Sequence, residues 1–289
     1  MSFIGSLLLA ALTVGTWNGK WFPSGRAEHR ASPAVEAATI EAAGKLLRQA
    51  YLKADPSGTN DLILCLNEIR GPAAARKLCT AMGLTNLQVA IVSGYRRRDR
   101  FDMQQDVIAT TLPIVSTNWC RWKSVKAETP PRGYAHALIA VSPAVTASVY
   151  AVHLKSNYGQ KKGAEEALNR AKRLHAVEQI ITAEHARRGA PTYPVIVAGD
   201  FNADFAHEAF KEDTLFDLLT KAGYQNTWAT VPRSQSATYD GGAKWGKATF
   251  DYVFMRGFIQ CGYPIAVPAG KLSDHYPVFV TLDIQPGKK

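Results

Sequence analysis

The sequence predicts an α/β (α+β) protein in which two packed sheets are flanked by helices. Two observations support this prediction. At 289 residues and 46% hydrophobic content the chain can bury a sizeable core, and no Ser/Gly/Pro linker or charge block divides it into halves. Strand-like and helix-like patterns also alternate along the chain, and a second strand-rich stretch follows them. We therefore expect a single domain over residues 12–289.

Apolar periodicity and turn signals give the order of the expected elements. They are a strand over 12–18, a helix over about 33–53, a strand over 61–67, a helix over 71–82, several strands as far as 154, a helix over about 163–187, and further strands after it. Residues 1–11 contain an apolar run that is too short to span a membrane. This run fits a signal-like segment and an extension of the first strand equally well.

The chain is basic, with a net charge of +10 and a pI near 9.4, which favours a polyanionic partner such as nucleic acid or an anionic membrane surface. Three segments interleave cations with aromatic residues, as contacts to a nucleic-acid strand would require, although a solvated basic surface would give the same pattern. They are residues 95–101, 119–123 and 244–247. We expect a monomer without membrane insertion, and we slightly favour a secreted or periplasmic location over a cytoplasmic one.

The four cysteines lack C-x-x-C spacing, so neither a zinc site nor a redox motif is indicated. Cys65 lies in an apolar strand and is expected to be a small buried hydrophobe. If the protein is exported, one or two disulfides could form, and the sequence does not give their pairing.

Acidic, amide and imidazole side chains stand at the ends of the predicted strands. Gly199-Asp200-Phe201-Asn202 follows the apolar run 193–198, and the two-residue alternation of a strand places Asp200 and Asn202 on one side. Ser273-Asp274-His275 precedes the strand-like run 276–282. Further strand ends carry Asn18, Glu68, His153 and Asp251. This set fits metal-assisted cleavage of a phosphate ester, which needs a cation on the nonbridging oxygens and an activated water.

The ordered set resembles the endonuclease/exonuclease/phosphatase superfamily over nearly the whole chain. It consists of Asn18, Glu68, His153, Asp200 with Asn202, Asp251, and Asp274 with His275. Within that superfamily, the amino-acid sequences of residues 198–204 and 273–278 are most similar to those of the deoxyribonuclease I group. The resemblance implies a four-layer αββα sandwich of two mainly antiparallel sheets. The superfamily includes nucleases, phosphatases and lipid phosphodiesterases, so membership implies the mechanism better than the substrate.

The resemblance also implies roles for these residues. Glu68 would ligate Mg²⁺ or Mn²⁺ directly, with Asn18 and Asp274 in or near the coordination shell, and Ca²⁺ could serve as a structural or auxiliary ion. His275 would pair with Asp251. The remaining roles fall to Asp200 for the nucleophilic water, Asn202 for a transition-state oxygen, and His153 for the phosphate or the leaving group. Whether Asp200 or His275 takes the proton stays open at this point.

Further residues are weaker candidates for substrate contacts. They are Arg70, Arg132, Lys155 and Asn157. Arg70 serves equally well as a surface ion-pair partner. In the deoxyribonuclease I group a glutamate orients the histidine that corresponds to His153, and the sequence offers only Asp106 and Glu128 as replacements. The other histidines lack a motif context and are interpreted as structural or surface residues. They are His29, His136, His175, His185 and His207.

The leading functional hypothesis is a divalent-metal-dependent nuclease, most simply a DNA endonuclease of low sequence specificity. The alternative within the same superfamily is a phosphomonoesterase or a lipid phosphodiesterase, of the inositol-phosphate phosphatase or sphingomyelinase type. A binding module with a decayed site is a third class, but the metal and histidine positions are all filled.

Overall fold

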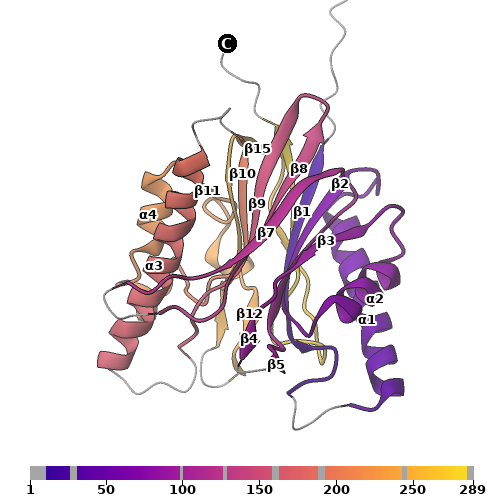
Figure 1. Ribbon diagram of the computed structural model, residues 1–289, viewed down its shortest axis with the longest axis horizontal. Coiled ribbons are helices and arrows are strands. Elements are labelled where there is room, and N and C mark those ends of the chain that lie inside the picture. Colours follow the sequence, from indigo (N-terminus) through magenta and orange to yellow (C-terminus); the bar gives the residue numbers. More distant parts are fainter. Residues whose placement is uncertain are drawn as a thin grey trace, which may run out of the picture.

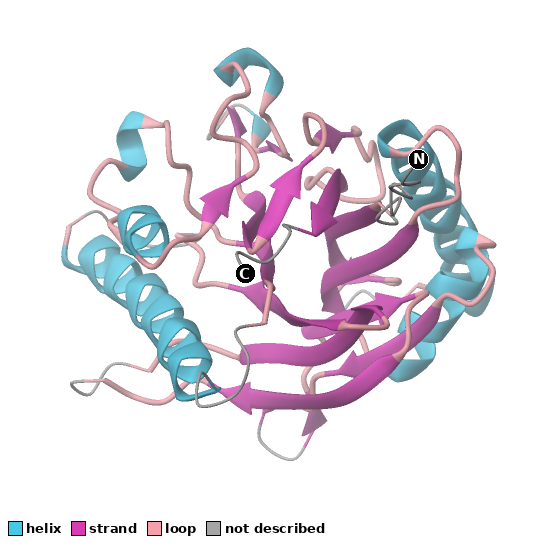
Figure 2. Cartoon of the chain, turned by 90° about the horizontal axis from the view of Figure 1, so that it is seen from above, coloured by secondary structure: helices cyan, strands magenta, loops and turns pink. Residues whose placement is uncertain are grey.

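Two β-sheets pack face to face at the centre of the molecule, and helices cover the outer face of each sheet (Figures 1 and 2). The computed structural model describes residues 11–26, 31–97, 100–125, 129–157, 163–187, 193–242 and 246–284. The arrangement confirms the predicted class, a sandwich of two sheets flanked by helices. No helix in the described ranges is long and apolar enough to cross a membrane.

The first sheet has β1 and β2 at its centre as a parallel pair, and its other neighbours run antiparallel. Its order is β15 (Phe258–Gln260), β17 (Val278–Ile284), β1 (Leu12–Phe22), β2 (Asp61–Ile69), β6 (Gln105–Thr110) and β3 (Gln88–Val92), with β16 (Ile265–Ala266) also on β17. Its outer face is covered by α1 (Pro33–Ala54) and α2 (Pro72–Met82).

The second sheet repeats this plan around the parallel pair β9 and β10. Its order is β11 (Gln225–Asn226), β14 (Asp251–Arg256), β10 (Val195–Asp200), β9 (Val145–His153), β8 (Gly133–Ser142) and β7 (Ile114–Arg121). Its outer face is covered by α3 (Ala164–Arg187) and α4 (Leu215–Lys221). The remaining elements are the ribbons β4 (Arg96–Arg97) with β5 (Arg100–Phe101) and β12 (Tyr239–Asp240) with β13 (Lys247–Ala248), and the short 3₁₀ helices Glu208–Phe210 and Arg233–Gln235.

Three hydrophobic layers hold the sandwich together. The middle layer joins the inner faces of the two sheets, for example Val14 and Ile63 with Ala151 and Ile196. The other two layers fill the space between each sheet and its helices. These layers bury most of the strand side chains, so the polar residues at the strand ends are exceptions that indicate a functional role.

The sequence also fixes where the outer helices begin and end. Ser32 caps α1 by accepting a hydrogen bond from the amide of Val35, and Pro33 occupies the first turn, where its missing N–H costs nothing. Helix α2 ends at Met82 and is capped by Gly83, whose φ of 62° is the left-handed conformation that glycine adopts readily. The predicted helices agree with α1, α2 and α3 to within a residue or two, whereas α4 was not predicted.

Strand direction brings the polar strand ends to a single edge of the sandwich. Strands β1, β2, β9 and β10 end at this edge, and the antiparallel strands β14 and β17 begin there. The register places Asp200 beside His153 on one side and Asp251 on the other. The two ribbons β4–β5 and β12–β13 lie at the same lower end in Figure 1. Residues more than 250 positions apart in the sequence therefore meet at this edge.

Candidate active site

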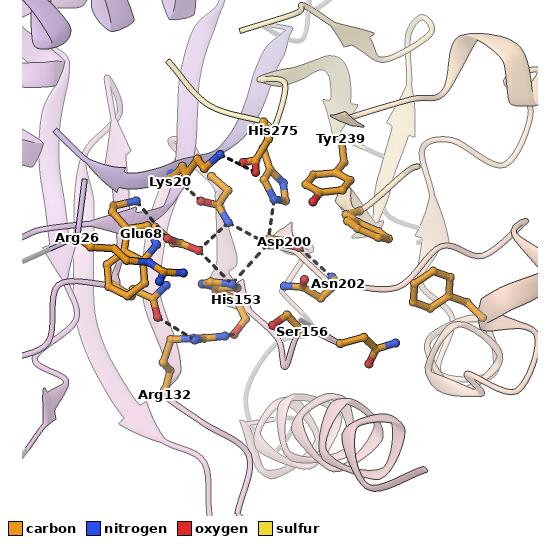
Figure 3. A pocket seen from close by; sticks show the side chains of 17 residues that line it. Lys20, Arg26, Glu68, Arg132, His153, Ser156, Asp200, Asn202, Tyr239 and His275 are labelled. Carbon is orange, nitrogen blue, oxygen red and sulfur yellow. Dashed lines mark hydrogen bonds and ion pairs between the residues drawn. The ribbon is translucent and has the colours of Figure 1, made fainter. Parts of the chain in front are cut away.

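A cavity of about 460 Å³ opens at this edge between the two sheets (Figure 3). Its lining combines carboxylates, amides and histidines with cationic and aromatic side chains. The lining residues are Asn18, Lys20, Trp21, Arg26, Glu68, Gln104, Arg132, His153, Ser156, Asn157, Asp200, Asn202, Phe210, Tyr239, Phe250, Asp274 and His275. The structure thus brings together most of the residues that the sequence motifs pointed to.

Strained backbone is concentrated at this cavity. Six non-glycine residues in the described ranges have a positive φ, and five of them line the cavity. The five are Lys20, Trp21, Glu68, Arg132 and Asn202. The register of β1 with β2 shifts after Asn18, so both strands bulge where they reach the site. Such conformations cost about 1–3 kcal/mol each and persist at functional sites where the surrounding structure holds them.

The Gly199-Asp200 motif is explained by the close approach of two strands. A Cβ atom on Gly199 would lie 1.9 Å from the carbonyl oxygen of Val152 on β9, and the φ of Gly199 is +148°. Only glycine fits there, so β10 can lie against β9 and present Asp200 beside His153. The amide of Asn202 then donates to Asp200 Oδ1 at 2.8 Å, which fixes the turn that follows.

Asp200 is the centre of the polar network. Its Oδ2 accepts a hydrogen bond from Asn18 Nδ2 at 2.9 Å, and it lies 3.4 Å from His153 Nε2 and 3.7 Å from His275 Nε2. Burial raises the pKa of Asp200 to about 7, with Asp251 adding to the increase and His275 opposing it. A carboxyl group whose pKa lies near neutral pH, and which lies between two imidazole rings, is suited to exchanging a proton.

His275 is held by Asp251, as the resemblance implied. His275 Nδ1 lies 2.9 Å from Asp251 Oδ2, which also accepts from Thr238 Oγ1 at 2.8 Å. Burial alone would lower the pKa of His275, but the carboxylates of Asp251 and Asp200 raise it to about 10. Ser273 anchors the motif, since its Oγ accepts from the His275 amide and donates to the Asn18 carbonyl. His275 is therefore fixed in position and stabilised as an imidazolium.

His153 differs from the expectation of an orienting carboxylate. Its Nδ1 is buried and has no hydrogen-bond partner among the described residues. Asp106, one of the two candidates, instead accepts from Asn67 Nδ2 and from the Tyr95 hydroxyl. Glu128, the other, lies outside the described residues. Burial, together with Arg132 and His275, holds the pKa of His153 well below its usual value, so a neutral ring presents Nε2 to the carboxylates.

The metal-ligating residues predicted from the sequence lie on the side of the cavity formed by the first sheet. Asn18 Nδ2 lies 3.3 Å from Glu68 Oε1, and Glu68 Oε2 accepts from the amide of Trp21. Asp274 Oδ2 lies 2.9 Å from the ammonium of Lys20. Carboxylate and amide oxygens are the donors that Mg²⁺ and Mn²⁺ prefer, so the donor set fits a hard divalent cation.

Asp200 also belongs to a second group of potential metal ligands, which it forms with Asp251 and His275. One ligand atom from each of Asp200, Asp251 and His275 lies within 4.8 Å of the others. However, the 2.9 Å contact between His275 Nδ1 and Asp251 already uses two of these groups. Asp251 Oδ1 is buried without a hydrogen-bond partner among the described residues. We therefore place the cation with Glu68 and interpret this group as the acid–base pair.

Two of the four weaker candidates line the cavity and two do not. Arg132 lines it, but its guanidinium donates to the carbonyls of His153 and Leu154 and to Gln104, so it does not offer a free two-pronged clamp for a phosphate. Asn157 lines it while its Oδ1 accepts from the buried Arg173. Lys155 is absent from the lining, and its ammonium contacts the carbonyl of Ser156.

The structure places Arg70, the fourth of these candidates, away from the cavity. Arg70 is absent from the cavity lining, and its guanidinium pairs with Glu36 at 2.8 Å and with the carbonyl of Gly25 at 3.1 Å. The alternative interpretation, an ion-pair partner, describes it better. It ties the beginning of α1 to the loop that follows β1.

The sequence motifs missed several residues of the cavity wall. Lys20 and Trp21 follow Asn18 after one glycine, Gly19, but a strand ending at residue 18 gave no reason to turn them inward. Arg26 lies over the ring of Trp21, with its guanidinium carbon 5.6 Å from the ring centroid. On the opposite wall Tyr239 packs against His275 at a centroid distance of 4.8 Å. The adjacent cation and aromatic in 20–21 were the only available signal.

The remaining sequence predictions have mixed outcomes. Tyr95 and Trp122 are buried, so they are not stacking surfaces, whereas Trp119 is 40% exposed. Residues 98–99 and 243–245, which include Arg98, Lys244 and Trp245 of two basic segments, lie outside the described residues. His136 is a buried structural residue, as predicted, and His29 lies outside the described residues. Cys65 is buried, as predicted, and the four cysteines are unpaired.

Comparisons with known proteins identify the family and agree with the fold. The model of the endonuclease/exonuclease/phosphatase family matches residues 15–275. An endonuclease/exonuclease/phosphatase from Beutenbergia cavernae aligns with a TM-score of 0.65 at 17% identity, covering 95% of this chain and 72% of that one. Humanized D. rerio TDP2 aligns with a TM-score of 0.59 at 15% identity, covering 95% of this chain and 99% of that one. Sphingomyelinase C from Streptomyces griseocarneus aligns with a TM-score of 0.58 at 17% identity, covering 94% of this chain and 99% of that one. The search of curated proteins found no match.

Proposed function

Because the chain belongs to the endonuclease/exonuclease/phosphatase family, whose members hydrolyse phosphate esters, we propose that it is a divalent-metal-dependent nuclease. More specifically, we propose a DNA endonuclease of low sequence specificity. The three solved structures compared above are below 25% identity and carry different names, so they support the fold rather than the substrate. The choice of substrate has to come from the cavity itself.

The observation that carries the proposal is the cationic rim around the acidic centre. Lys20, Arg26 and Arg132 line the cavity beside the carboxylates and histidines. With a chain charge of +10, this rim favours a polyanion whose reacting phosphate enters the centre while neighbouring phosphates remain near cations. Trp21, under Arg26, adds an aromatic edge of the kind that contacts bases.

The mechanism follows from the positions of these side chains. A divalent cation held by Glu68, with Asn18 and Asp274 nearby, would polarise the phosphate and stabilise the charge that develops in the transition state. His275, stabilised as an imidazolium by Asp251, offers Nε2 to a nonbridging oxygen. His153 offers its own Nε2 from the opposite side of Asp200.

Asp200 is the proton acceptor for the attacking water, beside the imidazolium of His275. Asp200 Oδ2 lies 3.7 Å from His275 Nε2, so a water bound at this carboxylate reaches both groups. Because the two groups interact strongly, their titration belongs to the pair rather than to either residue. Asn202, fixed by its amide on Asp200 Oδ1, turns its side chain to the Leu154 carbonyl and lines the same wall.

A lipid phosphodiesterase is the runner-up, and the exposed apolar residues argue against it. Seven large hydrophobic side chains of the described ranges are exposed, and none of them lines the cavity. They are Val35, Leu52, Val115, Trp119, Phe205, Ile259 and Tyr263. They are spread over both sheets, the helices and loops, whereas a site that draws a lipid from a membrane needs an apolar patch at its mouth.

A substrate panel tests the proposal. Purified protein is incubated with plasmid DNA, abasic duplex, single-stranded DNA, RNA, sphingomyelin and an inositol phosphate, with Mg²⁺, Mn²⁺ or EDTA. We expect plasmid nicking and linearisation with either metal, none with EDTA, and strongly reduced nicking with a His275→Ala protein of unchanged thermal stability. Faster turnover of sphingomyelin or inositol phosphate than of any nucleic acid would contradict the proposal.

A further inference from the structure

A second cavity of about 500 Å³ adjoins the active-site cavity. It is lined by Lys20, Asp240, Pro268, Gly270, Lys271, Ser273, Asp274 and Tyr276. The two cavities share Lys20 and Asp274, whose ammonium and carboxylate are 2.9 Å apart. A substrate that fills both cavities therefore passes over this ion pair. Nothing in the mechanism above uses the second cavity.

The charges of the second cavity are paired, with one exception. Lys20 is matched by Asp274. The Asp240 carboxylate accepts from the amide of Gly242 at 3.2 Å and from the phenol of Tyr276, whose pKa is raised by burial and by that carboxylate. Lys271 is exposed, and it makes no ion pair or hydrogen bond to any residue that the structure describes. Lys271 is therefore available to an external anion.

Lys271 is also held at a fixed place relative to the reacting centre. It lies in a turn closed by the hydrogen bond from the Leu272 amide to the Ala269 carbonyl at 3.1 Å. Gly270 enters this turn with a φ of 59°, which suits glycine. His275 lies four residues after Lys271. Between the two, the Ser273 hydroxyl donates a hydrogen bond to the Asn18 carbonyl of β1. The turn and the catalytic histidine thus share one anchored segment.

We propose that the second cavity binds the phosphate that neighbours the scissile phosphate in a nucleic-acid strand, and that Lys271 contacts it. The proposal rests on the proposed nuclease function and extends it, since it makes the substrate a polymer rather than a small diester. A strand carries one phosphate per nucleotide, so a strand that crosses from the first cavity into the second brings a second anion to this region. A diester without a neighbouring phosphate leaves Lys271 unused.

Two substrates and two matched variants test this inference. The variants are Lys271→Ala and Lys77→Ala, which remove the same charge, the second from the outer helix α2. The substrates are a 12-nucleotide single-stranded DNA and bis(p-nitrophenyl) phosphate, each with Mg²⁺ or Mn²⁺ at several salt concentrations. For each pair we measure kcat/KM and its dependence on the logarithm of the salt concentration.

We expect Lys271→Ala to lower kcat/KM for the oligonucleotide about 2- to 5-fold, the range of one exposed ion pair. We also expect its salt slope to become shallower by about 0.7, the value for one phosphate contact on a single strand. Hydrolysis of bis(p-nitrophenyl) phosphate should stay unchanged, and Lys77→Ala should resemble the wild type with both substrates.

Two results would overturn the inference, and they can be told apart. Equal effects of the two variants on the oligonucleotide, or an equal loss on both substrates for Lys271→Ala, would remove the second-phosphate site and leave the nuclease proposal intact. A wild-type protein that hydrolyses bis(p-nitrophenyl) phosphate but no nucleic acid of any length would overturn the proposed function and this site together.

Discussion

His136 and His275 are both buried histidines, yet their surroundings move their pKa values in opposite directions. His275 faces Asp251 and Asp200, which overcome burial and raise its pKa to about 10. His136, on β8, contacts Asn118, Ser148 and Arg187, and burial together with that arginine lowers its pKa to about 3. One ring is therefore held charged at neutral pH and the other is held neutral.

The difference shows where this chain concentrates chemistry. Around His136, Ser148 Oγ and Tyr150 OH both donate to the Glu184 carboxylate, so a Ser, His and Glu constellation is satisfied internally and buried under α3. Around His275, the carboxylates meet at an open cavity. Residue types alone would not distinguish these two clusters. Access to solvent and the sign of the neighbouring charges do.

The largest loss of activity is expected from Asp200→Asn. This change keeps the hydrogen bond from Asn18 geometrically feasible but removes the group that shares the proton with His275. We expect kcat to fall by about 10²–10⁴-fold, the usual contribution of general acid–base catalysis. This fall in kcat is measured by steady-state kinetics on plasmid or oligonucleotide DNA, and thermal unfolding serves as the control for folding. Retention of more than a tenth of the activity would contradict the role of Asp200.

The next largest effect is expected from Glu68→Gln. Loss of the carboxylate charge should weaken Mg²⁺ or Mn²⁺ binding by at least about 10- to 100-fold. Isothermal titration calorimetry of the metal with each protein gives the affinity independently of activity, and excess metal should restore part of the rate. Unchanged metal affinity would place the cation elsewhere, for example at Asp200, Asp251 and His275.

A smaller effect is expected from Asp251→Asn, which keeps the shape of the side chain but removes the carboxylate that contributes most to the raised pKa of His275. We expect kcat to fall roughly 10- to 100-fold, part of the acid–base contribution. The pKa of His275, followed by NMR of the imidazole, should move down toward the ordinary value of about 6.5. A His275 that titrates as in the wild type would show that Asp251 is not its charge partner.

The smallest effect on activity, and a clear effect on stability, is expected at His136. In the unfolded chain this ring takes up a proton below about pH 6.5, whereas in the fold it does so only near pH 3, so stability falls as the pH drops between these values. At pH 5 the loss is about 2 kcal/mol. Buried carboxyls with a raised pKa, such as Asp200, change stability in the opposite direction over this range. The contribution of His136 is therefore measured by chemical unfolding at pH 7 and pH 5 as the difference between the wild type and His136→Gln, with the exposed His185→Gln as the control.

On going from pH 7 to pH 5, the free energy of unfolding of His136→Gln should end about 2 kcal/mol higher, relative to its own value at pH 7, than that of the wild type, because no ring is left to protonate. The variant is expected to be less stable at pH 7, since it disturbs the bonds to Asn118 and Ser148. An unchanged pH dependence would mean that other groups dominate acid unfolding.

Strand ends were the part of the site that the sequence predicted well. Asn18, Glu68, His153, Asp200 and His275 all reached one cavity. A polar residue at the end of an apolar strand is costly to bury without a partner, so several such residues in one chain indicate a shared site. The two parallel pairs at the sheet centres then bring these ends to the same edge. Local pattern and a regular sandwich were sufficient for this level of detail.

The bulges and the long-range partners could not be predicted. Lys20 and Trp21 enter the cavity through consecutive left-handed residues, which no two-residue alternation anticipates. The guanidinium groups of Arg70 and Arg132 are directed to neighbours from other elements, Glu36 and the His153 carbonyl. A side chain with several donors takes whatever acceptors the fold brings near, and those acceptors are remote in sequence.

The most direct measurement compares His275→Ala with His136→Gln in a single phosphodiesterase assay with thermal unfolding in parallel. We expect His275→Ala to lose about 10²–10⁴-fold in kcat/KM while unfolding near the wild-type temperature. We expect His136→Gln to keep its activity to within about 3-fold while unfolding at a lower temperature. Near-normal hydrolysis by His275→Ala, or a loss of similar size in a well-folded His136→Gln protein, would contradict the assignment of the active site to this edge of the sandwich.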